Sequence, residues 1–415
     1  MHILIVTQYF WPENFKINDL ALELRNKGHE VTILTGQPNY PEGKFFKGYS
    51  YSKPSFENWK GIDIIRLPTI SRGMGSPIKL TLNYISFPFI GRIQWHNRLK
   101  GRVFDLIFIC QLSPVFVALP AISIKKQLKL PLVMWVLDLW PESVFAASKV
   151  KPLFLEKPLR AIVRYIYHSC DLILISSQSF CKSVSSFGIP DERIKYFPNW
   201  AEQMFLSNQF LEYNGLPSFP EGFIILFAGN IGEAQDIETI IKAAEKLRDY
   251  KYIKWIFLGD GRKRAWLQNE IKVRELSDQI LWLGKYPSNI MPYFFSQASV
   301  MLASLKKNSA FELTVPAKLQ TYMASRKPVI SLLSGEGNQI VKKSNCGYFV
   351  PSGDSRLLSE AVLKMSTLSK KELAQLANNG YQYYLENFDK DMLMNKLEST
   401  LINLVDKFHS IQSLR

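Results

Sequence analysis

Glycines follow three apolar runs in the second half of the chain. Ile224–Ala228 precedes Gly229-Asn230-Ile231-Gly232, Ile253–Leu258 precedes Gly259-Asp260-Gly261, and Ile280–Leu283 precedes Gly284. Glycine lets the backbone approach a ligand closely, and backbone N–H groups in such turns bind phosphate oxygens. Tight turns alone would explain one such glycine, whereas three in succession favour a crevice for a phosphate or a nucleotide.

A lysine stands in the first turn of a helix predicted within Thr314–Ile330. Thr314 is the expected N-cap, Pro316 suits the first turn, and one apolar face carries Leu319, Tyr322 and Met323. Lys318 conflicts with the helix dipole, which favours an anion at this end. A bound anion between Lys318 and the helix N-terminus would resolve the conflict. The alternative is a solvated lysine on an ordinary helix.

Two carboxylates follow the predicted strand Leu132–Leu137, in the sequence Asp138-Leu139-Trp140-Pro141-Glu142. Open α/β sheets bind ligands at the carboxyl ends of their strands. Asp138 and Glu142 are therefore candidates to orient or deprotonate a substrate hydroxyl. The alternative for Asp138 is that it caps the next turn.

Apolar runs alternate with helical spacing through both halves. The other predicted strands are Ile3–Val6, Val31–Leu34, Ile62–Leu67, Leu106–Cys110, Leu172–Ile175, Val300–Ala303 and Val329–Leu333. This alternation predicts an α/β fold with two Rossmann-like βαβ domains. Prolines and glycines in residues 198–222 indicate the junction. We expect an N-terminal domain at 1–200, a linker at 201–222, a C-terminal domain at 223–385, and a helix at 386–415 that packs back on the N-terminal domain.

Several classes of site are disfavoured. The residues after the first strand, Gln8–Asn14, contain no GxGxxG, which argues against a dinucleotide fingerprint. The five His lack zinc-site spacing, and Asp389-Lys390-Asp391 resembles a helix first turn, so no metal is expected. No signal peptide and no transmembrane helix are predicted. Four Cys without paired spacing fit a reduced cytosolic compartment.

The net charge of +15 lies mostly in the first 200 residues, which points to an anionic partner. Pro77–Arg102 mixes large apolar side chains with lysines and arginines and has no acidic residue. It predicts an amphipathic helix on an anionic membrane surface. The alternative is a core-facing helix with a basic solvated side. Nucleic-acid binding is disfavoured because no known binding module is present.

The second half resembles the retaining glycosyltransferases of family 4, which have the GT-B fold. The resemblance is carried by the GNxG loop at Gly229, the GDG turn at Gly259, and PAKLQTYMASRKPVI from Pro316. The opening, including QYFWPENFKINDL from Gln8, and DLWPES from Asp138 are similar to bacterial O-antigen and capsule enzymes of the fucosamine-transferase type. These motifs extend the resemblance over nearly the whole chain.

The resemblance implies an acceptor in the N-terminal domain, a nucleotide-diphosphate sugar in the C-terminal domain, and reaction in the cleft between them without a metal or other cofactor. The implied donor-binding residues are Gly229, Asn230, Gly232, Gln235, Gly259, Gly261, Arg262, Lys263, Lys318 and Thr321. The candidate acceptor-binding residues, which follow the first and fifth strands, are Tyr9, Trp11, Asn14 and Trp140. The candidate catalytic residues are Asp138, Glu142 and Lys318. Backbone N–H groups and a lysine suit the charge that builds on a leaving diphosphate.

The diphosphate site departs from the family pattern at two positions. The family commonly carries an Arg just after the first glycine and a Lys five residues later. Here these positions are Asn230 and Gln235, which are neutral. The diphosphate would therefore depend more on Lys318, with Arg262 or Lys263.

The following helix departs from the pattern as well. The family's second Glu of E-x7-E, which usually binds the ribose, corresponds to Thr321, and the first corresponds to Leu313, next to Glu312. Arg326 replaces a usual Gly. If the backbone there is left-handed, Arg costs on the order of 1 kcal/mol relative to Gly.

We expect a cytoplasmic enzyme, peripheral on the inner face of the plasma membrane, that transfers a sugar from a UDP donor, in preference to GDP, to a polyprenyl-diphosphate-linked saccharide in O-antigen or other polysaccharide synthesis. N-acetyl-L-fucosamine is the sugar that the resemblance suggests. A UDP-sugar 2-epimerase of the same fold and a non-catalytic nucleotide- or membrane-binding scaffold are the alternatives. The sequence leaves the acceptor sugar, the linkage and the oligomeric state open.

Overall fold

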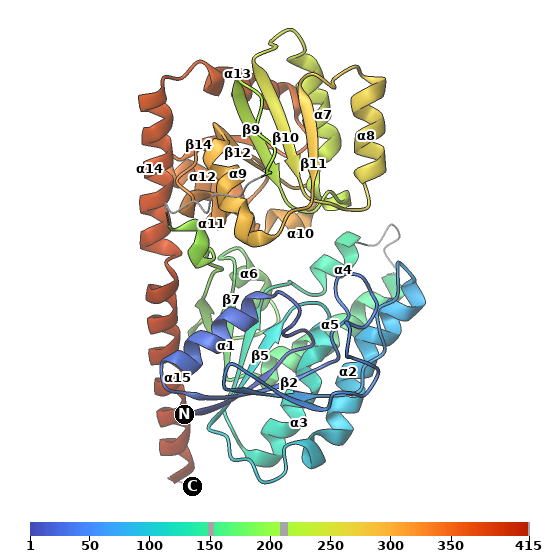
Figure 1. Cartoon of the computed structure of the whole chain (residues 1–415). Coiled ribbons are helices and arrows are strands. Elements are labelled where there is room, and N and C mark those ends of the chain that lie inside the picture. Colours follow the sequence, from blue (N-terminus) through green and yellow to red (C-terminus); the bar gives the residue numbers. More distant parts are fainter. Residues whose placement is uncertain (148–152, 208–214, 414–415) are drawn as a thin grey trace. The chain divides into compact units, whose positions relative to one another are not determined.

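The computed structural model of the chain describes residues 1–147, 153–207 and 215–413 (Figure 1). The chain forms two compact units. Unit 1 comprises Met1–Pro198 together with Asp391–Arg415, and unit 2 comprises Asn199–Lys390. Each unit is an α/β structure built on its own sheet.

Unit 1 contains an eight-stranded sheet in the order β3-β4-β2-β1-β5-β6-β7-β8. All pairs are parallel except β3 with β4. The strands are β1 (His2–Val6), β2 (Glu30–Thr35), β3 (Phe56–Trp59), β4 (Ile62–Arg66), β5 (Leu106–Gln111), β6 (Leu132–Val136), β7 (Leu172–Ile175) and β8 (Ile194–Tyr196). Two inner strands, β6 and β7, are apolar and buried along their whole length, as is typical of parallel strands with both faces covered.

The helices of unit 1 include one from the far end of the chain. They are α1 (Lys16–Asn26), α2 (Pro77–Arg98), α3 (Ala118–Leu128), α4 (Glu142–Ala147), α5 (Leu153–Ser169), α6 (Phe180–Ser185) and α15 (Lys390–Ser413). Glu398 on α15 pairs with Lys27 at 2.9 Å and with His29 at 3.0 Å. These contacts join α15 to the turn between α1 and β2.

Unit 2 contains a fully parallel six-stranded sheet in the order β11-β10-β9-β12-β13-β14. The strands are β9 (Phe223–Ala228), β10 (Ile253–Leu258), β11 (Ile280–Gly284), β12 (Val300–Ser304), β13 (Val329–Leu333) and β14 (Gly347–Pro351). The helices are α7 (Ile237–Lys246), α8 (Arg264–Val273), α9 (Met291–Gln297), α10 (Ser309–Glu312), α11 (Ala317–Ala324), α12 (Glu336–Ser344), α13 (Ser355–Ser366) and α14 (Lys370–Asn387).

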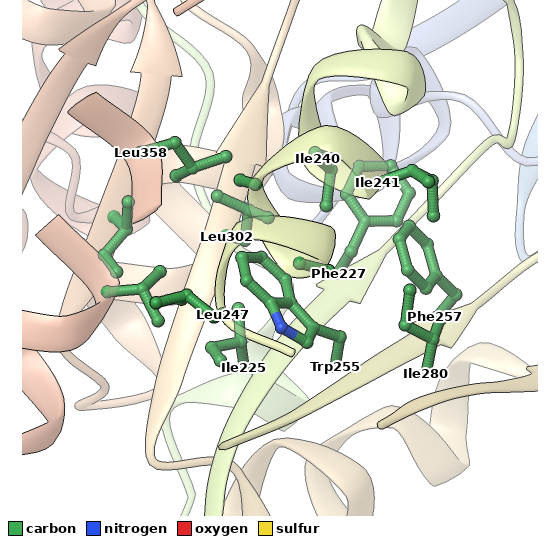
Figure 2. Close-up of a cluster of buried hydrophobic side chains, with 14 of the residues drawn as sticks. Ile225, Phe227, Ile240, Ile241, Leu247, Trp255, Phe257, Ile280, Leu302 and Leu358 are labelled. Atoms are coloured by element: carbon green, nitrogen blue, oxygen red, sulfur yellow. The ribbon is translucent and has the colours of Figure 1, made fainter. Parts of the chain in front are cut away.

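The core of unit 2 has one hydrophobic cluster on each face of the sheet. Figure 2 shows one of them, in which Trp255 of β10 lies among side chains of β9, β12 and α7. Alternate strand residues enter opposite clusters: Ile225 and Phe227 belong to one, and Ile224 and Leu226 to the other. This two-sided burial fixes the sheet and therefore the position of the loops at its edge.

The predicted strands are all present, and three short edge or terminal strands, β3, β8 and β14, were not predicted. The prediction of a linker at 201–222 is wrong for the part that the structure describes, because that part belongs to unit 2. The chain divides at Pro198, and Ala201 and Phe205 are buried in the core of unit 2. Apolar residues among the prolines explain the difference, because they pack on α9 and its neighbours. Residues 208–214 of the expected linker lie outside the described residues.

The N-cap of α11 is a second correction. Pro316, not Thr314, occupies the cap position, and it makes no side-chain cap hydrogen bond. The Thr314 hydroxyl instead donates to the carbonyl of Ala310 in the preceding α10. The apolar face of Leu319, Tyr322 and Met323 is buried as predicted.

Candidate active site

Each sheet reverses its winding direction at one pair of neighbouring strands. In unit 2 this switch lies between β9 and β12, and in unit 1 between β1 and β5. Ligands of open α/β sheets bind outside the carboxyl ends of the strands at such points. The predicted donor residues follow β9, β10 and β12 in unit 2, and the predicted acceptor residues follow β1 and β6 in unit 1.

The three glycine-ended strands are direct neighbours, in the order β11-β10-β9. Gly229, Gly259 and Gly284 have φ angles of 148°, 131° and 82°. A Cβ on Gly259 would lie 1.8 Å from the carbonyl oxygen of Gly229, and one on Gly261 would lie 2.2 Å from that of Ile231. These glycines are needed because the two loops pack backbone against backbone.

Lys318 of α11 reaches this glycine edge. Its Nζ donates a 2.6 Å hydrogen bond to Oε1 of Gln235 and lies 4.3 Å from the centre of the Phe227 ring. A Cβ on Gly229 would be 3.3 Å from the same Nζ. Burial lowers the pKa of Lys318 to about 7. Within the described residues no carboxylate pairs with this lysine, so a bound anion would restore its charged form.

The neighbouring cations differ in whether carboxylates pair with them. Lys263 is buried, pairs with Glu238, and lies 3.3 Å from Glu233. Lys306 pairs with the same two carboxylates, with Glu233 at 3.1 Å and with Glu238 at 3.4 Å. Lys263 was predicted to assist the diphosphate, but these carboxylates already balance its charge. Arg262 is exposed and pairs with no carboxylate in the described part of the chain.

The neutral replacements in the glycine loop have definite positions. Asn230 is exposed, and its side-chain amide lies within 2.6 Å of the positions that a Cβ on Gly232 or Gly261 would occupy. Gln235 holds Lys318 through its side chain, and its backbone carbonyl accepts a 2.6 Å hydrogen bond from Ser304. Gln235 thus positions the lysine without neutralising it.

Two residues that depart from the family pattern lie on α11 or just after it. Thr321 is partly buried, and its hydroxyl donates to the Ala317 carbonyl of its own helix at 3.3 Å. Arg326 follows α11 with a φ of 51°, which is the left-handed region that the replaced glycine would favour. Its guanidinium lies 4.0 Å from the centre of the Tyr381 ring, a contact that offsets part of the strain.

In unit 1, Asp138 belongs to a small polar cluster after β6. Its carboxylate accepts hydrogen bonds from the Ser113 hydroxyl and, at 3.1 Å, from Nε1 of Trp140. Glu142 has other partners: Ser183 donates to it at 3.1 Å, and Arg160 lies 3.7 Å away. The two carboxylates that the sequence suggested as a pair therefore belong to separate hydrogen-bond groups.

An arginine that the sequence reasoning missed lies among three tyrosines. The Arg72 guanidinium is 5.7 Å from the Tyr9 ring centre, 5.1 Å from Tyr40 and 5.7 Å from Tyr84. It donates a 2.9 Å hydrogen bond to the Tyr9 hydroxyl. Burial raises the pKa of Tyr84, and the nearby charge of Asp138 adds to that rise. Asp138 therefore lies close enough to Tyr84 to affect its pKa.

Tyr9 itself is almost fully buried, and its side chain stacks on Phe15. Trp11 is partly buried against Trp59, and Asn14 is exposed. Tyr9 is placed to hold Arg72, whereas Trp11 and Asn14 have surface free for other contacts. These predicted acceptor residues thus differ in burial, from the buried Tyr9 to the exposed Asn14.

Two further buried charges hold the loops of this edge. Glu13 accepts backbone N–H groups of Asn39 and Tyr40 at 2.8 and 2.7 Å, and burial raises its pKa to about 7. Arg66 is fully buried, pairs with Glu57, and donates to the Gly36 carbonyl at 2.9 Å. The sequence signal for them is only that Glu13 follows Trp11-Pro12 and that Arg66 stands between Ile65 and Leu67.

Comparison with known families assigns both units. Residues 17–202 match the family described as Glycosyltransferase Family 4, and residues 212–383 match Glycosyl transferases group 1. The probable glycosyltransferase WbjE of Pseudomonas aeruginosa is 26% identical over 273 residues, which are 61% of this chain and 66% of that protein. The chain is a glycosyltransferase. A second relative of this glycosyltransferase is the putative colanic acid biosynthesis glycosyl transferase WcaI of Escherichia coli K12. It is 26% identical over 346 residues, 78% of this chain and 81% of that protein.

Solved structures give the fold of the glycosyltransferase. Sucrose-phosphate synthase from Thermosynechococcus elongatus superposes with a TM-score of 0.73 at 15% identity, over 98% of this chain and 99% of that one. HepE from Anabaena, solved in complex with UDP, superposes with a TM-score of 0.68 at 12% identity, over 97% and 100%. The fold is GT-B, which confirms the prediction of two Rossmann-like domains.

Proposed function

We propose that this glycosyltransferase moves a sugar from a UDP-linked donor to a polyprenyl-diphosphate-linked saccharide during synthesis of a bacterial surface polysaccharide. The observation that carries the proposal is Lys318, a cation held by a neutral amide beside three glycine-ended strands. The description of WcaI as a colanic acid enzyme and the complex of HepE with UDP support the pathway and the nucleotide.

The donor diphosphate would lie along the Gly229–Gly232 and Gly259–Gly261 loops. Transfer breaks the bond between the sugar's anomeric carbon and the diphosphate oxygen, which keeps the electron pair. Backbone N–H groups and the Lys318 ammonium would stabilise that growing charge. Exposed Arg262 could approach the same anion, whereas Lys263 would act by holding the loop through Glu233 and Glu238.

The acceptor would lie at the β1 and β6 edge of unit 1. Asp138 would accept the proton of the attacking hydroxyl while Ser113 and Trp140 hold its carboxylate in place. Arg72 would contact the acceptor diphosphate, because in the described residues no carboxylate pairs with it. Retention of configuration and N-acetyl-L-fucosamine as the sugar are parts of the proposal that rest on the family resemblance.

The proposal includes no metal ion, because protein groups supply the positive potential at the diphosphate. Turnover should therefore survive EDTA. The glycosyltransferase would work at the cytoplasmic face of the inner membrane, where a polyprenyl-linked acceptor is held. In the described chain no helix is long and apolar enough to cross a bilayer.

A panel of nucleotide sugars tested against a polyprenyl-diphosphate-GlcNAc analogue, with products identified by mass, tests the proposal. We expect one UDP-sugar to give an acceptor product larger by one sugar. A changed sugar on the nucleotide without acceptor would instead indicate an epimerase. Donor binding with no turnover across the panel would favour a non-catalytic scaffold.

A further inference from the structure

The outer face of α2 is unusual for a helix in contact with water. Ile78, Ile85, Phe89 and Ile93 are 74, 51, 64 and 62% exposed, and Leu82 is 44% exposed. Met74, in the loop before the helix, is 74% exposed. Large apolar side chains gathered on one exposed surface mark a binding surface more often than a solvated one.

The exposed side chains form a single stripe. They recur at intervals of four, three, four and four residues, which keeps them on one side of an α-helix. The opposite side carries the buried residues Asn83, Phe87, Gly91 and Trp95. One side of α2 therefore packs into unit 1, mainly against α3, and the other side, which is apolar, stays uncovered.

The charge around this stripe has one sign. No Asp or Glu occurs from residue 64 to residue 104. Lys79, Arg92 and Lys100 are exposed on or beside α2, and in the described residues none of them pairs with a carboxylate. Apolar side chains flanked by unpaired cations match the two parts of an anionic bilayer surface, its acyl region and its headgroups.

A cavity of about 420 Å³ adjoins the stripe between α2, α3 and α5. Arg92 and Lys126 line it together with Ser123, Gln127 and Tyr165. Lys126 Nζ is 3.1 Å from the Tyr165 hydroxyl and 5.4 Å from the centre of its ring. Two cations and several hydrogen-bond donors around one hollow suit a phosphate group.

We propose that the outer face of α2 docks on an anionic membrane and that the adjoining cavity holds a lipid headgroup phosphate. The proposal deepens the proposed function and rests on it, since a lipid-linked acceptor must be met at the bilayer. A second copy fits this surface less well, because a two-fold interface would bring the cations of α2 against those of its partner.

Flotation with vesicles tests the docking without donor or acceptor. We expect the whole chain to bind vesicles of phosphatidylcholine with phosphatidylglycerol, to bind pure phosphatidylcholine weakly, and to dissociate as salt is added. Phe89→Glu or Ile93→Glu should weaken binding about tenfold or more. Arg92→Ala and Lys126→Ala should each weaken it about fivefold.

Matched changes outside the stripe serve as controls. Val273→Glu alters a 70% exposed apolar side chain of unit 2, and Lys251→Ala removes an exposed cation there. Both should bind vesicles as the unchanged chain does, and circular dichroism should show all variants folded. Unchanged vesicle binding by both glutamate variants would overturn the proposal. So would a dimer that Phe89→Glu dissociates, combined with no vesicle binding.

The two proposals fail in distinguishable ways. If both hold, Phe89→Glu loses transfer to vesicle-embedded acceptor but keeps transfer to a water-soluble acceptor analogue. Vesicle binding that depends on Phe89, without sugar transfer to either acceptor, would overturn the proposed function and leave the docking surface. Transfer to embedded acceptor that is unaffected by Phe89→Glu would overturn the docking surface alone.

Discussion

The two sheets present opposite chemistry at the carboxyl ends of their strands. The edge of unit 2 is lined by glycine backbone at Gly229, Gly259 and Gly284, with Lys318 as the cation beside it. The edge of unit 1 is lined by side chains, among them Arg72 within its three tyrosines and Asp138 with Ser113 and Trp140.

Under the proposed function, this difference would let one scaffold serve two substrates. A diphosphate is similar in every nucleotide sugar, so closely packed backbone N–H groups can bind it without reading the sugar. An acceptor must be distinguished from related saccharides, which requires contacts from side chains. The predictions at Lys318 and Gly259 test the edge of unit 2, the prediction at Arg72 tests the edge of unit 1, and the pH series compares the two.

The largest effect is expected at Lys318. Lys318→Ala should lower kcat by about 10²–10³-fold, because it removes charge stabilisation from the leaving diphosphate. The fold should persist, since the lost partner is the neutral Gln235. Steady-state kinetics with the native donor measures the change, and Lys342→Ala, an exposed lysine of α12, is the control. Turnover close to that of the unchanged enzyme would refute the role of Lys318.

Close packing of the glycine loops predicts the next largest effect. Gly259→Ala places a Cβ 1.8 Å from a backbone oxygen at a φ of 131° and should lower the free energy of unfolding by about 2–4 kcal/mol. Gly353→Ala, with a φ of 86° and open space around it, should cost only about 1 kcal/mol. Urea denaturation compares the two. Equal losses would mean that the loops do not need their close contact.

Arg72 should affect the acceptor and not the donor. Arg72→Ala removes a charge-assisted contact with the proposed acceptor diphosphate and should raise the acceptor KM about tenfold. The donor KM should stay the same. Lys53→Ala, an exposed lysine in the same unit, controls for net charge. A parallel rise in both KM values would indicate a general structural role instead.

The two edges should also respond to pH in opposite directions. Burial lowers the pKa of Lys318 from 10.5 to about 7, so between these values the unfolded chain binds the extra proton and stability rises with pH. Burial raises the pKa of Glu13 from 4.5 to about 7, so in that window the folded chain binds the extra proton and stability falls as pH rises. Lys318→Met and Glu13→Gln should each flatten one slope in urea denaturation over a pH series. A slope that persists in its variant would assign it to other groups.

The smallest effect is expected at Arg326. Arg326→Gly removes left-handed strain of about 1 kcal/mol but also the contact with Tyr381, so the net change should stay within about 0.5 kcal/mol. In a Tyr381→Leu background the same change should stabilise by about 1 kcal/mol, as measured by urea denaturation. Destabilisation in that background would show that Arg326 has a further partner.

Local patterns predicted the elements well and their ends less well. The strands Ile253–Leu258 and Val329–Leu333 have the predicted bounds because both are mostly apolar and buried on two faces. The cap of α11 was wrong because a threonine can bond to a preceding turn as readily as to its own helix. Edge strands such as β3 were missed because half of each strand faces solvent.

Sequence by itself therefore determined the βα order, the glycines at the strand ends and the position of Lys318, because these depend on residue type and local period. Tertiary structure alone decided which groups meet. It placed Gln235 on Lys318, carboxylates on Lys263, and tyrosines from three separate segments around Arg72. It also left one side of α2 uncovered. These pairings follow from strand order and packing between distant segments, which no local pattern specifies.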